Sequence, residues 1–175
     1  MVAALREGQL DLIVNYLYPA PAIPEDLAQE YLYDDVAVVC ASMQHRFAGL
    51  ARVTMEQLGQ EWWVLPGPQI PHVQWLFKTF HDHGLPPPRI RVETHPLRLR
   101  LQTVASSDLL GFISRHALQQ AAPRFHLKEL PVKELLLRRP VGVIYRKDGY
   151  LPHAVRRLIE KLKATAQEPS PAKKG

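Results

Sequence analysis

The sequence has little cysteine and no long apolar run. Cys40 is the only cysteine among 175 residues, which excludes an internal disulfide and a multi-cysteine zinc site. No apolar stretch approaches the ~20 residues that a membrane helix requires. Arg6, Glu7, Gln9 and Asp11 interrupt the N-terminal segment, so the basic-then-apolar pattern of an export signal is absent there. We therefore expect a cytoplasmic protein without a membrane segment.

Motifs for catalysis, nucleotides and metals are also missing. The sequence has no Gly-x-Ser-x-Gly elbow, no Gly-x-x-x-x-Gly-Lys loop and no Gly-x-Gly-x-x-Gly turn. Ser107 and Asp108 with a distant histidine are too common a combination to define a triad. His81 and His83 are two positions apart on a predicted helix and do not face one another. We expect no enzyme, no cofactor and no metal.

The net charge of +5 is unevenly distributed along the chain. Residues 1–60 carry three basic and eight acidic side chains, and the remainder carries nineteen basic and nine acidic ones. A basic half is compatible with an anionic ligand or with nucleic acid. The basic residues are scattered, however, and no aromatic residues alternate with them to form a base-stacking surface. Solvated surface positions are the simpler interpretation.

Short apolar runs alternate with amphipathic segments along most of the chain. Strands are predicted at residues 10–14, 35–40, 62–65, 90–94, 109–114 and 140–145, with weaker alternation at 27–33 and 125–132. The apolar run at 10–14 is typical of a buried parallel strand. Helices are predicted at residues 54–58, 72–83, 97–105, 115–122 and 152–166. Thr54 and Gln57 are placed to form a capping box at the start of the first helix, and Gly84 is placed to end the second. Residues 167–175 are expected to be a disordered tail. This alternation predicts an α/β protein with mostly parallel sheets.

The N-terminal segment is typical of the end of a helix rather than of a whole one. Residues 1–7 are amphipathic, no N-cap residue precedes them, and Gly8 is placed to terminate the helix. The chain is therefore expected to begin inside an element.

The order of several short motifs resembles that of the effector-binding domain of LysR-type transcriptional regulators. The motifs are LREGQLDL at 5–12, LYDD at 32–35, HRFA at 45–48, WWVLP at 62–66, VET at 92–94, SDLLG at 107–111, RPVG at 139–142 and LPHA at 151–154. The RPVG and VET motifs are most similar to a branch named for a galactose-binding-protein regulator, together with regulators of aromatic catabolism. The family's His-Pro-Leu-Ala motif has lost its proline here, where Arg46 follows His45.

The resemblance implies a fold like that of type 2 periplasmic binding proteins, with two α/β subdomains and a ligand cleft between them. Subdomain I would comprise residues 1–61 and 138–175, and subdomain II residues 62–137. The family's helix-turn-helix, its linker helix and the first strand of subdomain I would lie before Met1. An interior strand missing from the sheet would leave unpaired backbone groups, so we expect the isolated chain to be aggregation-prone or only partly ordered there.

Candidate ligand-binding residues follow from the ends of the predicted strands, because ligands of open α/β sheets bind at the carboxyl ends of strands. Backbone N–H groups at the following helix N-termini are suited to a carboxylate or phosphate. Titration of His95 would make binding depend on pH, and a buried, inert thiol is the alternative for Cys40. Ordinary loop and cap roles are the alternative for the whole set, which is Asn15, Tyr16, Cys40, Gly67, Gln69, Thr94, His95 and Ser114.

The predicted function is that of a regulatory domain that senses a small molecule such as a carboxylate or a sugar. The resemblance also implies homo-oligomers of the full-length protein and DNA contact only through a helix-turn-helix that this chain lacks. A solute-binding protein of a transport system is the alternative, because it would share the fold, but the lack of an export signal disfavours it.

Overall fold

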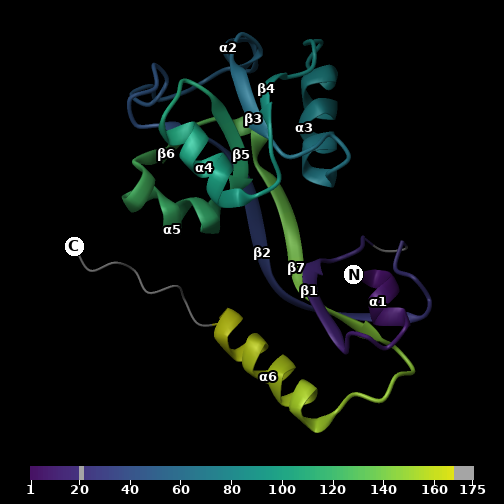
Figure 1. The fold of residues 1–175 in the computed structure, drawn as a ribbon. Coiled ribbons are helices and arrows are strands. Elements are labelled where there is room, and N and C mark those ends of the chain that lie inside the picture. The colour runs from purple at the N-terminus through teal and green to yellow at the C-terminus, as the bar shows by residue number, and fades with distance from the viewer. Residues whose placement is uncertain (20–21, 168–175) are drawn as a thin grey trace. The chain divides into compact units, whose positions relative to one another are not determined.

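The computed structural model describes residues 1–19 and 22–167. The chain forms two compact units. Unit 1 consists of Met1–Asp35 and Arg139–Gly175, and unit 2 of Val36–Arg138. Two long strands, β2 (Leu27–Ser42) and β7 (Leu137–Arg146), belong to both units (Figure 1). The predicted tail overlaps the described residues only at Gln167, the last residue of a helix, and residues 168–175 lie outside them.

Unit 1 is a small sheet with one helix on each face. Strand β1 (Leu12–Tyr16) pairs antiparallel with β7, which in turn neighbours β2. Helix α1 (Val2–Arg6) buries Leu5 against one face, and α6 (His153–Gln167) buries Ile159 against the other. As predicted, α1 is followed by Gly8, whose φ of 76° is the left-handed conformation that glycine adopts most readily.

Two predictions for unit 1 were wrong. The strand expected at residues 10–14 begins two residues later and is antiparallel to its neighbour, with Val14 47% exposed rather than buried. The separate strands expected at 27–33 and 35–40 are one continuous strand, β2. The polar pair Asp34–Asp35 interrupts the apolar pattern but not the backbone pairing, because alternate residues of a strand face opposite sides.

The sheet of unit 2 mixes parallel and antiparallel pairs, so the expectation of mostly parallel strands was wrong. Strand β3 (Trp62–Leu65) is parallel to both β4 (Arg89–Glu93) and β5 (Leu110–Ser114). Strand β2 is antiparallel to β5 and to β6 (Leu127–Glu129). Local patterns identify strands but not their partners, which are distant in sequence.

Two apolar clusters cover the two faces of this sheet. Helices α2 (Met55–Gly59) and α3 (Pro71–Asp82) and the 3₁₀ helix η1 (Lys133–Leu135) pack with Trp63 and Phe112 on one face. Helices α4 (Leu97–Ala105) and α5 (Arg115–Phe125) pack on the other, around Val38 and Val64. Helix α5 runs three residues beyond the predicted end, through Pro123, and ends at His126 with φ 51°.

The division into units differs from the expected subdomain boundaries. Residues 36–61 were assigned to subdomain I from the sequence, but in the structure they belong to unit 2. The physical reason is packing: this half of β2 pairs with β5 and β6, and Met55 and Leu58 of α2 enter the same core as Trp63. The second boundary, near residue 138, agrees within one residue.

Candidate functional site

Three parallel strands of unit 2 end at one edge of the sheet, which we call the carboxyl edge. Leu65 at the end of β3 is paired with Glu93 at the end of β4, and the Thr94 amide donates to the Leu65 carbonyl at 3.0 Å. Strand β5, parallel to β3, ends at Ser114. Each strand leads into a helix, so α3, α4 and α5 all begin at this edge. The carboxyl edge therefore gathers three positive helix ends.

Two of these three helices lack a side-chain cap. Ile70 precedes α3 and Pro96 precedes α4, and neither forms a capping hydrogen bond. The third helix, α5, is capped by Ser114, whose hydroxyl accepts from the Ala117 amide at 3.3 Å. The first N–H groups of a helix have no partner inside it. Helices α3 and α4 thus present backbone donors suited to an anion.

Side-chain donors stand beside these helix ends. The Gln69 amide folds over Gly67: a Cβ at position 67 would lie 2.5 Å from its nitrogen and oxygen. Thr94 is half-buried and His95 is exposed. Within the described part of the chain, the Gln69 amide and the Thr94 hydroxyl make no side-chain hydrogen bond. The structure therefore brings together Gly67, Gln69, Thr94, His95 and Ser114 at one edge, as strand ends predicted.

Other side chains at the carboxyl edge were not among the sequence candidates. His72 lies in the first turn of α3, and its ring centre is 6.2 Å from that of Phe112 on β5. Trp75 stacks on the same Phe112 ring at 6.0 Å with an interplanar angle of 7°. His72 begins the helix that follows β3, so the strand-end rule could have identified it.

Arg115, the first residue of α5, is already paired. Its guanidinium donates two hydrogen bonds to Glu129 on β6, at 2.8 and 2.7 Å. The same partner raises the pKa of Arg115, chiefly through these bonds. The positive charge nearest to Ser114 in sequence is thus balanced within unit 2.

Cys40 is not part of the carboxyl edge. It lies within β2 opposite Gly111, is fully buried, and packs with Val64 and Val104. Burial raises the pKa of its thiol to about 12, so the thiol stays protonated and unreactive. Cys40 is therefore a buried, inert cysteine, which was the alternative interpretation.

The remaining two candidates lie in unit 1 and are held by their own neighbours. The Asn15 side-chain oxygen accepts from the Tyr16 amide at 2.8 Å. The Tyr16 hydroxyl donates to Asp35 at 3.1 Å, and the Arg139 guanidinium lies 3.8 Å above the Tyr16 ring. Arg139 also donates to Asp35 at 2.7 Å. Burial is the main cause that raises the pKa of Tyr16 to about 12, so its hydroxyl remains a donor.

The groups at the carboxyl edge are suited to binding a molecule rather than to catalysing its reaction. Amide, hydroxyl and backbone donors converge there without a nucleophile beside a base. Among the described residues no group of three or more metal-ligating side chains occurs. No helix in the described ranges is long and apolar enough to span a membrane. The edge is suited to holding a small polar or anionic molecule.

The fold and the carboxyl edge together define a class: an α/β ligand-binding domain built from two units that share long strands. Comparison with known protein families identifies the particular family within this class. The LysR substrate binding domain family matches residues 1–167, and the chain belongs to that family. It is a regulatory, effector-binding domain of the LysR type and not an enzyme.

Similar proteins of known name or structure are regulators. The chain is 29% identical over 146 residues to the HTH-type transcriptional regulator GalR of Pseudomonas putida, covering 83% of this chain and 36% of GalR. It is similar to the CcmR regulatory domain of Synechocystis PCC6803, solved with 2-PG, at a TM-score of 0.81 and 20% identity over 95% of this chain and 78% of that one. The effector-binding domain of QuiR with shikimate gives a TM-score of 0.75 at 14% identity over 94% and 76%.

The chain thus spans 36% of the length of the curated relative it matches. The likeness to the solved structures, at 14% to 20% identity, concerns the fold alone.

Proposed function

We propose that this chain senses a small anionic metabolite at the carboxyl edge of unit 2, as the effector-binding part of a cytoplasmic LysR-type regulator. The observation that carries the proposal is the convergence of α3 and α4, both without a side-chain cap, beside the Gln69 amide and the Thr94 hydroxyl. The effectors printed for two structural relatives, 2-PG and shikimate, support a carboxylate or phosphate.

Asn15 and Tyr16 of unit 1 stay a separate prediction and are not part of the site proposed at this edge. A ligand that binds one conformation of a domain better than another shifts the equilibrium between them. In the full-length protein this shift would act on a homo-oligomer and on DNA bound by a helix-turn-helix domain. These whole-protein properties are proposals that follow from the family.

A thermal-shift screen with carboxylates and phosphates, starting from shikimate and 2-phosphoglycolate, tests the function. A ligand at 100 times its Kd stabilises the folded state by ~2.7 kcal/mol. We expect at least one anion to stabilise the wild-type chain, and T94V and Q69A to weaken that anion about tenfold each, since each substitution removes one hydrogen-bond donor. T103V on α4, which removes a hydroxyl bonded to Leu99 within the helix, is the matched control and should leave binding unchanged. Equal affinity in T94V, Q69A and T103V would contradict the proposed site.

A further inference from the structure

A second pocket lies in unit 2, at the edge opposite to the carboxyl edge. Strand β2 is antiparallel to β5 and ends at Ser42, and helices α4 and α5 end beside it at Ala105 and Phe125. The pocket has a volume of about 390 Å³, within the range of small-molecule sites. None of the residues proposed for the carboxyl edge lines this pocket.

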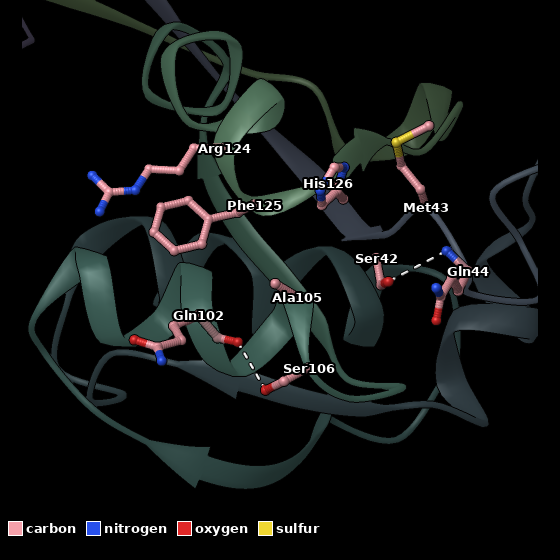
Figure 2. Close-up of a pocket in the computed structure, with 9 residues that line it drawn as sticks. All are labelled: Ser42, Met43, Gln44, Gln102, Ala105, Ser106, Arg124, Phe125 and His126. Atoms are coloured by element: carbon pink, nitrogen blue, oxygen red, sulfur yellow. Dashed lines mark hydrogen bonds between the residues drawn. The ribbon is translucent and has the colours of Figure 1, made fainter.

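The pocket has donors on one side and apolar surface beside them. Figure 2 shows Arg124, Phe125 and Gln102 together on one side, and Ser42, Met43 and Gln44 on the other. The Arg124 guanidinium lies 5.7 Å from the Phe125 ring centre. Met43 is 59% exposed and adds apolar surface to the pocket. The site therefore offers a cation, two side-chain amides and apolar surface.

Helix C-termini ordinarily favour cations, because their last carbonyl groups lack partners. Here those carbonyls are engaged. The Ser106 hydroxyl donates to the Gln102 carbonyl at 2.9 Å, and the Ser107 hydroxyl donates to the Thr103 carbonyl at 2.6 Å. The Met43 amide donates to the His126 carbonyl at 2.8 Å. These three carbonyl acceptors are thus used within the protein.

The donors, by contrast, are unused within the described chain. The Arg124 guanidinium makes no ion pair there, and the side-chain amides of Gln44 and Gln102 make no hydrogen bond. None of the nine lining residues is acidic. A ligand carboxylate would meet a guanidinium and an amide, which form charge-assisted hydrogen bonds, while an apolar body would cover Phe125 and Met43.

We propose that this distal pocket binds a small carboxylate that carries an apolar or aromatic group, as a site separate from the carboxyl edge. It would let unit 2 respond to a second molecule, whether or not the first site is occupied.

The test uses the full chain with two probes of the same shape, 3-phenylpropionate and its uncharged amide, 3-phenylpropanamide. Titration followed by backbone-amide NMR locates each probe. We expect shifts at Met43, Phe125 and His126, with the acid bound about tenfold more tightly than the amide. R124Q should weaken the acid about tenfold and leave the amide unchanged.

R98Q is the matched control, since Arg98 is an exposed arginine in the first turn of α4 at the carboxyl edge. It should leave binding at the distal pocket unchanged. Should R124Q fail to fold, the comparison of acid with amide on the wild-type chain still decides. Equal affinity for the two probes, no shifts at the pocket, or a loss in R98Q instead of R124Q would overturn the proposal. Shifts confined to Gln69 and Thr94 would overturn it while supporting the carboxyl edge.

Discussion

At the scale of single residues, the buried guanidinium atoms of Arg100 lower the stability of the fold. Its Nε and Nη1 atoms are buried and have no hydrogen-bond partner within the described chain. Burial is the main cause that lowers its pKa, and the nearby Cys40 thiol opposes this only in part. A charge held this way destabilises the fold, because its solvation is lost without a partner to replace it.

Replacing Arg100 by methionine should therefore raise the free energy of unfolding by about 1–3 kcal/mol, measured by urea denaturation. R98M on the same helix is the control, and its exposed side chain should change stability by less than about 0.5 kcal/mol. A destabilised R100M would show that the guanidinium is satisfied after all.

Gly142 occupies a position with no space for a side chain. A Cβ there would lie 2.1 Å from the backbone oxygen of Glu30, a distance that demands a shift of β7 or β2. G142A should cost about 1–3 kcal/mol of stability. In G59A, the control, a Cβ would meet nothing within 4 Å, and stability should rise by about 0.5–1 kcal/mol because the residue is helical. Equal effects of the two substitutions in thermal unfolding would contradict this account.

His45 makes stability depend on pH. The Phe47 amide donates to its Nδ1 at 3.1 Å. Burial is the main cause that lowers its pKa, although Glu61 and Asp108 oppose the effect. The unfolded chain therefore takes up a proton as pH falls through about 6.5, before the folded chain does, so stability rises with pH in this window.

H45N keeps an acceptor for the Phe47 amide but cannot be protonated. The loss of unfolding free energy between pH 7.5 and pH 5.5 should be smaller in H45N than in the wild-type chain. Parallel curves in urea titrations at both pH values would mean that His45 does not titrate differently on folding.

At the scale of elements, an ion pair fastens β2 to β7 where both strands leave unit 1. The side chains of Asp35 and Arg139 are 4% and 12% exposed, and their bond is 2.7 Å. D35N should cost about 3–5 kcal/mol, because it leaves the Arg139 charge buried without its counter-ion. D26N breaks the Arg6–Asp26 pair, whose side chains are about half exposed, and should cost much less. Comparable losses in urea denaturation would contradict a special role for the buried pair.

The sequence predicted most helix boundaries well. The Thr54 capping box is present, with the Thr54 hydroxyl accepting from the Gln57 amide and the Gln57 side chain accepting from the Thr54 amide. Gly84, with φ 70°, follows α3 where expected. These signals are local: a cap or a left-handed glycine acts within one turn. Strand partners and burial depend on distant residues, which is why the direction of β1 was predicted wrongly.

At the scale of the whole molecule, the candidate site was partly predictable for the same reason. Residues after strand ends were expected to bind ligand, and Gln69, Thr94 and Ser114 do share one edge because β3, β4 and β5 are parallel. Cys40 shows where the rule fails: β2 continues past it to Ser42, so it does not end a strand. The distal pocket had no sequence signal, because it arises where the ends of two helices and a strand meet.

Binding of the effector at the carboxyl edge of unit 2 is tested by a backbone-amide NMR titration of the full chain with whichever anion raises its Tm most in the screen. We expect the largest shifts at residues 66–70, 94–98 and 114–117. Shifts confined to other parts of unit 2, with these three segments unchanged, would contradict it.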